Sequence, residues 1–111
     1  MRVTGSVRET FSASHSTAVC GYGLHGHTFT AEIEVESDQD GDGINYIDLA
    51  ARLHSTIVEF ASRDLGDMLV PAVPEQLCLY LRERLALFVP NIVGVRVHLG
   101  NMTASVEFPL R

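Results

Sequence analysis

The sequence predicts an α+β domain of order ββααββ, a four-stranded antiparallel sheet with two helices on one face. Three observations predict it. Residues 27–37 alternate apolar and polar side chains with a period of two, as a half-buried strand does. Residues 47–61 and 74–88 carry apolar side chains at spacings of three and four, as amphipathic helices do. At 111 residues the chain can enclose one hydrophobic core, so we expect a single domain over residues 1–111.

Two strands come first. Residues 2–14 alternate loosely, and Gly5 within them predicts a bulge or bend. Residues 27–37 alternate cleanly, with threonines and glutamates on one face and apolar side chains on the other. The polar segment SDQDGDG then ends this strand in a turn. The apolar face of the second strand is expected to comprise Phe29, Ala31, Ile33 and Val35.

Two helices and two closing strands follow. Asp48 is placed as a cap or as an acid in the first turn of the first helix. Pro74 is placed in the first turn of the second helix, where a backbone N–H would have no partner within the helix. The strands cover residues 92–100 and 103–110, joined by a short Gly-Asn turn. The buried face of the second helix is expected to comprise Leu77, Leu81, Leu85 and Phe88.

Composition excludes several classes of partner. Eight basic residues, all arginine, stand against fourteen acidic ones and give a formal charge of −6, so no basic face for nucleic acid is expected. The apolar stretches are shorter than the roughly 20 residues of a membrane span. The N-terminal residues lack the apolar core of a signal peptide, so the cytoplasm is the expected location, and no disulfide between Cys20 and Cys78 is expected there.

Three histidines could converge on one point. His25 and His27 are two residues apart at the start of the second strand, so they share one face. His15 ends the preceding strand, and an antiparallel connection brings it back beside them. Three imidazoles with a fourth position left open are typical of catalytic zinc. The alternative is that these are surface histidines or hydrogen-bonded turn residues.

Four segments, taken in order, carry a resemblance to a known family. FSASH is followed by a cysteine, LHGH opens a strand, DGDGINYIDLAARL leads into a helix, and the second helix has a glutamate near its start. Over nearly the whole chain, this order resembles the 6-pyruvoyl-tetrahydropterin synthase and 6-carboxytetrahydropterin synthase family. The resemblance implies the tunnelling fold. It also implies a homo-oligomer, usually a hexamer of two trimers, in which the sheets join into a barrel and the sites lie between subunits.

The family acts on a dihydropterin with a polyol side chain, usually 7,8-dihydroneopterin triphosphate. The resemblance implies that His15, His25 and His27 bind a catalytic zinc, which acidifies protons on the side chain of this small-molecule substrate. It also implies that the Cys20 thiolate moves protons as a general base. The alternative for Cys20 is a packed, inert cysteine. Cys78 is expected in the core of the second helix.

The chain departs from the family in places that matter for chemistry. Asp64 matches the aspartate of an Asp-His pair and stays a catalytic candidate, but Leu65 replaces the relay histidine. Glu75 is kept as a candidate substrate-binding residue near the start of the second helix. Leu99 takes the position of the glutamate that holds the pterin ring, unless a one-residue slip of the strand puts His98 there.

Three functions are compatible with this pattern. The favoured one is a zinc-dependent lyase or synthase that acts on a dihydropterin-like or related polyol-bearing substrate different from the usual one. The second is the ordinary family reaction, with His54 or His98 replacing the lost groups. The third is a non-catalytic zinc-containing binding or oligomerisation module of the same fold.

Overall fold

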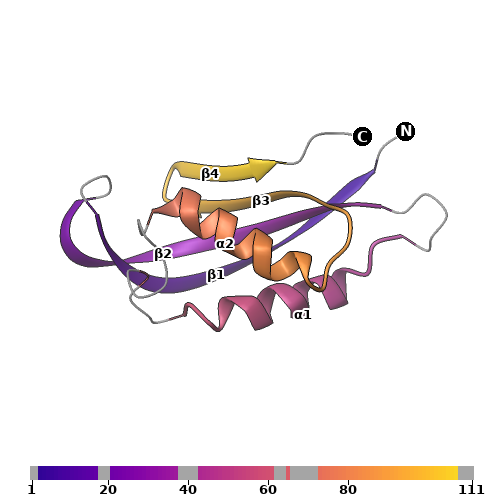
Figure 1. Ribbon diagram of the computed structural model, residues 1–111, viewed down its shortest axis with the longest axis horizontal. Helices are drawn as coiled ribbons and strands as arrows, with labels where there is room; N and C mark the ends of the chain where they lie inside the picture. The colour runs from indigo at the N-terminus through magenta and orange to yellow at the C-terminus, as the bar shows by residue number, and fades with distance from the viewer. Residues whose placement is uncertain (1–2, 18–20, 38–42, 62–64, 66–72, 108–111) are drawn as a thin grey trace.

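The computed structural model describes residues 3–17, 21–37, 43–61, 65 and 73–107. For residues 14–17 and 21–27 it describes the backbone alone. The order ββααββ is confirmed, and both helices lie on one face of the sheet (Figure 1). The elements are β1 (Thr4–Thr17), β2 (Gly21–Glu36), α1 (Tyr46–Ile57), α2 (Pro74–Ala86), β3 (Ile92–Leu99) and β4 (Met102–Glu107).

The sheet has the order β1-β2-β3-β4, and every neighbouring pair is antiparallel. β1 and β2 are much longer than the other two strands. The β2–β3 ladder ends at Thr30 opposite His98, whereas the β1–β2 ladder continues to Thr17 opposite Gly21. Residues 11–17 and 21–29 therefore form a two-stranded extension of the sheet, called the arm below. Figure 1 shows the arm curving away from the helices.

The hydrophobic core lies between the sheet and the helices. The predicted apolar face of β2 is confirmed, because Phe29, Ala31, Ile33 and Val35 are all buried. At the base of the arm the rings of Phe11 and Phe29 stack with their centroids 5.5 Å apart. Burying each large side chain of this kind contributes about 1.5–3 kcal/mol relative to exposure. The core thus fixes the helix-covered face of the sheet up to the point where the arm begins.

Both helices are shorter than the spacing of their apolar residues predicts. α1 begins after Asn45, whose side-chain oxygen accepts a hydrogen bond from the Asp48 N–H at 3.0 Å, so Asn45 is the cap and Asp48 is an acid of the first turn. α1 ends at Ile57 and continues only as turns. α2 ends at Ala86, and Phe88, predicted on its buried face, is 60% exposed. Of the described helices, neither is long and apolar enough to cross a membrane.

The prediction of a bulge at Gly5 is wrong. Gly5 pairs regularly with Val35, and the β1–β2 register shifts only between His15 and Thr17. A Cβ atom at Gly5 would collide with the hydroxyl group of Tyr46 at the start of α1. The glycine is needed because α1 approaches the backbone of β1 closely at this point.

β2 also begins earlier than predicted. The strand starts at Gly21 rather than at residue 27, so the glycine-rich stretch that leads to His25 is itself paired with β1. Three glycines within eight residues weaken the sequence signal for a strand. The stretch pairs with residues of β1 only 4 to 10 positions before it, from Thr17 opposite Gly21 to His15 opposite His25. This hairpin pairing outweighs the weak local preference of the glycines for a strand.

Candidate functional site

The backbone brings the three predicted zinc-binding positions together on the arm. His15 pairs directly with His25, and Ala13 pairs with His27. Positions directly opposite each other, or two apart on one strand, belong to the same face of a ladder. Ala13 and Phe29 are buried on the helix-covered face, so positions 15, 25 and 27 continue that face beyond the core.

These positions fit a zinc site of three imidazoles. Directly opposite residues of an antiparallel pair have Cβ atoms about 4.5–5.5 Å apart, and imidazole nitrogens are ordinary zinc ligands. The side chains of the three histidines lie outside the described ones. Among the side chains that the structure does describe, no group of three His, Cys, Asp or Glu residues could hold a metal.

The two predicted catalytic residues, Cys20 and Asp64, lie outside the described residues. Cys20 immediately precedes Gly21, the first residue of β2. Leu65 is described and is 2% exposed, as a member of the hydrophobic core. The residue predicted to replace the relay histidine is therefore part of the core.

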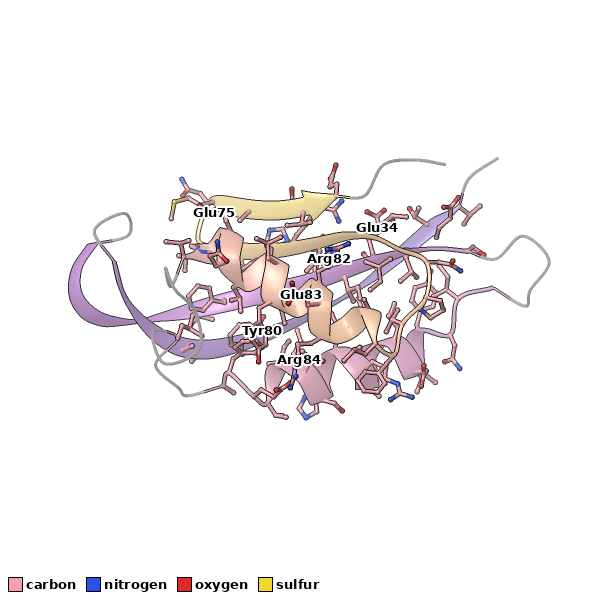
Figure 2. All side chains as sticks on the ribbon, viewed as in Figure 1. Glu34, Glu75, Tyr80, Arg82, Glu83 and Arg84 are labelled. Carbon is pink, nitrogen blue, oxygen red and sulfur yellow. The ribbon has the colours of Figure 1, made fainter. Side chains whose placement is uncertain are left out.

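The predicted substrate-binding residues lie on different faces. Glu75 is exposed in the first turn of α2, at the end of the helix that lies toward the turn between β3 and β4 (Figure 2). Leu99 is 6% exposed and, like Val95 and Val97, points into the core. In this register Leu99, and not His98, faces the core. His98 lies on the opposite face of the sheet, called the open face below.

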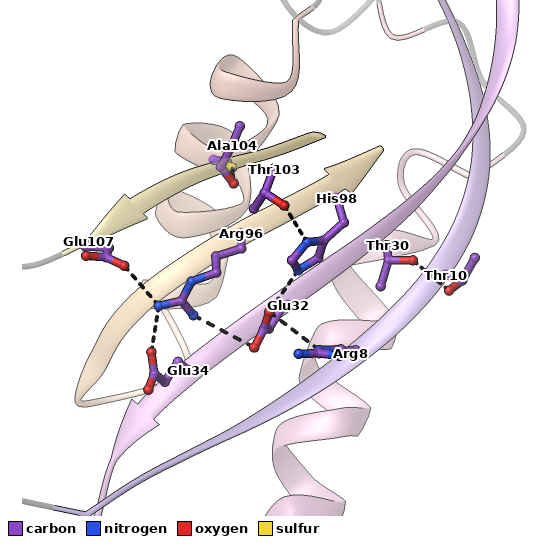
Figure 3. A network of polar contacts seen from close by, with 11 residues as sticks. Arg8, Thr10, Thr30, Glu32, Glu34, Arg96, His98, Thr103, Ala104 and Glu107 are labelled. Carbon is purple, nitrogen blue, oxygen red and sulfur yellow. Dashed lines mark hydrogen bonds and ion pairs between the residues drawn. The ribbon is translucent and has the colours of Figure 1, made fainter. Parts of the chain in front are cut away.

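His98 takes part in a network on the open face, shown in Figure 3. Its Nε2 atom is 2.9 Å from Glu32 Oε1, and its Nδ1 atom is 2.9 Å from Thr103 Oγ1. Glu32 also lies 3.5 Å from Arg8 Nε and 3.9 Å from Arg96 Nη1. Glu32 is only 7% exposed, although the alternation of β2 predicts a solvated side chain.

Opposing effects act on the pKa of Glu32. Burial alone raises it, but the hydrogen bond from His98 and the charges of Arg8 and Arg96 outweigh burial and hold the pKa below the ordinary value of 4.5. A carboxyl whose pKa is lowered by folding stabilises the folded state above its unfolded pKa. This contribution is lost as the pH falls through the folded pKa.

We expect Glu32→Gln to reduce the acid sensitivity of the protein. The variant should be less stable than wild type at neutral pH by about 1–3 kcal/mol, since hydrogen bonds to a charged group are lost. The gap should narrow as the pH falls below 4.5, the ordinary pKa of the carboxyl, and close once the pH has fallen through the lower folded pKa and Glu32 is protonated in the folded wild type as well. Urea unfolding at a series of pH values measures this. Glu83→Gln, which removes an exposed glutamate of α2, is the matched control, and parallel profiles for all three proteins would contradict the expectation.

His54 is held away from the arm. Its Nδ1 atom lies 3.0 and 2.9 Å from the two carboxylate oxygens of Glu9, and its side chain is 64% exposed. Glu9 precedes His15 by six residues, which is about 20 Å of strand. Within one protomer, His54 is therefore not brought to the predicted zinc positions.

Cys78 lies in the core, as predicted. It is fully buried, and its Sγ donates to the carbonyl oxygen of Ala104 at 3.3 Å. Burial raises the pKa of the Cys78 thiol to about 11. The thiol stays protonated at neutral pH, so Cys78 is not a nucleophile or a base.

Sequence reasoning missed the network around Glu32. The sequence contains its signal, because Arg8, Glu32 and Arg96 are charges of opposite sign that face one another across three strands. That signal becomes visible only when the register of the strands is known.

Comparisons with known proteins agree on one fold. A model of the family described as 6-pyruvoyl tetrahydropterin synthase matches residues 4–108. The 6-pyruvoyl tetrahydropterin synthase of Caenorhabditis elegans superposes with a TM-score of 0.80 at 15% identity, over 98% of this chain and 97% of that chain. The Plasmodium falciparum synthase superposes with a TM-score of 0.74 at 15% identity, over 98% and 99%.

An uncharacterized protein of Wolinella succinogenes has the same architecture, with a TM-score of 0.71 at 13% identity over 96% of this chain and 98% of that chain. Likenesses at these identities establish the fold alone. A search of curated protein sequences finds no match to the chain.

Proposed function

Because this chain belongs to the 6-pyruvoyl tetrahydropterin synthase family, we propose that it is a zinc-dependent lyase acting on a dihydropterin-like or related polyol-bearing substrate. The observation that carries the proposal is the register of the arm. It aligns the positions of His15, His25 and His27 on one face without any rearrangement of the backbone. The donor set, three imidazoles with room for one more ligand, is that of a catalytic zinc site.

The proposed role of each residue in the site follows from the chemistry of its side chain. His15, His25 and His27 would hold the zinc. A bound zinc supplies a Lewis acid that lowers the pKa of protons next to the oxygens it holds. The Cys20 thiolate takes up such a proton and returns it, and a cation nearby favours the thiolate over the thiol. Asp64 is proposed to assist this transfer.

The substrate is proposed to differ from the usual dihydropterin. Leu99 and Leu65 are 6% and 2% exposed, and neither can hydrogen-bond to a pterin ring or relay a proton. A site that gives up charge-assisted hydrogen bonds to a polar ring gives up much of its selectivity for that ring. We therefore assign to the substrate an apolar or smaller group where the family holds the ring. Glu75 remains available for a polar contact.

The tail of the substrate is proposed to lack a triphosphate. A triphosphate needs several cationic partners, and the chain holds eight arginines and no lysine against fourteen acids. Among the described arginines, Arg8 and Arg96 contact Glu32, and Arg84 contacts Glu59. These guanidinium groups are already engaged within the protomer.

A homo-oligomer, with a hexamer favoured, is part of the proposal. β1 and β4 form the two edges of the sheet, and each has one side that no described strand of the same chain covers. An exposed edge is a template for pairing with another strand. Pairing of β4 in one copy with β1 in the next would join the sheets into a barrel.

The proposed reaction is tested by incubating the zinc-loaded protein with each of three substrates. These are 7,8-dihydroneopterin triphosphate, its unphosphorylated form, and a polyol on a smaller ring, with products followed by mass spectrometry. We expect turnover of an unphosphorylated member and weak or no turnover of the triphosphate. No zinc-dependent product from any member would contradict the enzyme proposal.

A second candidate function is a non-catalytic zinc-containing binding or oligomerisation module. The burial of Leu65 favours it, because a core leucine stands where a proton relay is expected. Such a module would keep zinc and ligand affinity and would show no turnover.

A further inference from the structure

Among the described residues, no third strand pairs with the arm. β3 pairs with β2 only from Val35 to Thr30, so the three histidine positions lie beyond the four-stranded part of the sheet. A two-stranded ribbon is marginally stable when nothing else holds it. Within the described part of the chain, the contacts that orient these positions relative to the sheet are those at the base of the arm.

The base of the arm is held on both faces. On the helix-covered face, Phe11 stacks on Phe29, and Phe60 packs against Phe11 with ring centroids 6.3 Å apart. On the open face, the pair next to Phe11 and Phe29 in the ladder is polar. It consists of Thr10 and Thr30, whose hydroxyl groups lie 3.0 Å apart. The last residue of β3 that pairs with β2 is His98, opposite Thr30.

The ring of His98 links three strands at this level (Figure 3). Because a carboxylate only accepts hydrogen bonds, His98 Nε2–H donates to Glu32 on β2, while Nδ1 bonds to Thr103 on β4. Glu32 in turn contacts Arg8 on β1. The line from Arg8 through Glu32 and His98 to Thr103 thus crosses all four strands. It runs where the arm leaves the sheet.

We propose that His98 is a positioning residue, which holds the base of the arm through Glu32 and Thr103 and so sets the orientation of the three histidine positions. The role toward zinc rests on the proposed function, but the role toward the arm does not. His98 lies on the face opposite the histidine positions and acts on them through the backbone of β2.

Amide hydrogen exchange of the metal-free, chelator-treated protein tests the role toward the arm. We expect His98→Ala to speed exchange in residues 11–17 and 21–29 about tenfold, as the loss of a hydrogen bond to a charged group does. Exchange in α1 and α2 should stay as in wild type. His98→Gln, which keeps an N–H that can donate to Glu32, should restore most of the protection.

His54→Ala is the matched control, because it removes a histidine that is also bonded to a glutamate but lies away from the arm. It should leave exchange in the arm unchanged. Equal exchange in wild type and His98→Ala, or a uniform increase over the whole sheet and both helices, would overturn the proposal.

Zinc affinity, measured on the same variants by competition with a chelating dye, tests the role toward the site. We expect His98→Ala to weaken zinc binding several-fold, with recovery in His98→Gln. If wild type binds no zinc, the proposed function fails, while the exchange experiment still decides the role of His98 in the arm. If wild type binds zinc and His98→Ala binds it equally well, the positioning role toward the site is overturned.

Discussion

Replacing His27 with alanine is expected to remove zinc from the protein. Wild type, purified and supplied with zinc, should hold one zinc per chain by elemental analysis, and His27→Ala should hold almost none after dialysis. The physical reason is that two remaining imidazoles are too few for a stable site. Substitutions of residues that merely orient a ligand cost roughly 10–100-fold in metal affinity, and loss of a ligand itself should cost more.

His54→Ala controls for the removal of any histidine. His54 lies on α1 and is bonded to Glu9, away from the predicted zinc positions. The zinc content of the His54→Ala variant should therefore equal that of wild type. Circular dichroism of both variants checks that the fold is intact. Zinc retained by His27→Ala would show that the site is elsewhere. An absence of zinc from wild type would leave the fold without this chemistry, and the enzyme proposal would then be dropped.

Replacing Cys20 with alanine is expected to abolish most of the turnover while leaving zinc in place. Loss of a positioned general base lowers rates by about 10²–10⁴-fold. The expected pattern is a fall in kcat with little change in substrate affinity, because the thiolate acts on the reacting proton and contributes little to binding. Steady-state kinetics on whichever substrate the panel identifies, together with zinc content, measures it.

Cys78→Ala is the matched control for Cys20→Ala. The Cys78 thiol is fully buried and its pKa is raised to about 11, so its removal should not affect kcat. Full activity in Cys20→Ala would show that another group is the base. If wild type and Cys20→Ala bind zinc and ligand equally and neither turns the ligand over, the non-catalytic module is the better description.

Much of the fold follows from local patterns in the sequence. The period of two in β2 predicts its buried face, and Pro74 marks the start of α2. These signals are reliable because each depends on neighbouring residues alone. The ends of the elements are less predictable. Phe88 continues the apolar spacing of α2, yet the helix stops before it and leaves the ring 60% exposed.

The sequence by itself determined the fold class, the alternation that places Leu99 in the core, and the set of residue types from which the zinc site is proposed. Tertiary structure alone decided where those residues lie. The sequence predicts that His15 returns beside His25, and the structure fixes the register that sets the two directly opposite each other. Pairing with β1 also made a strand of the glycine-rich stretch before His25. Glu32 became buried among charges from β1 and β3. The physical reason is that the exact register of two strands, and the burial of a side chain by several strands, depend on contacts that no local pattern encodes, whereas periodicity and caps depend on neighbours along the chain.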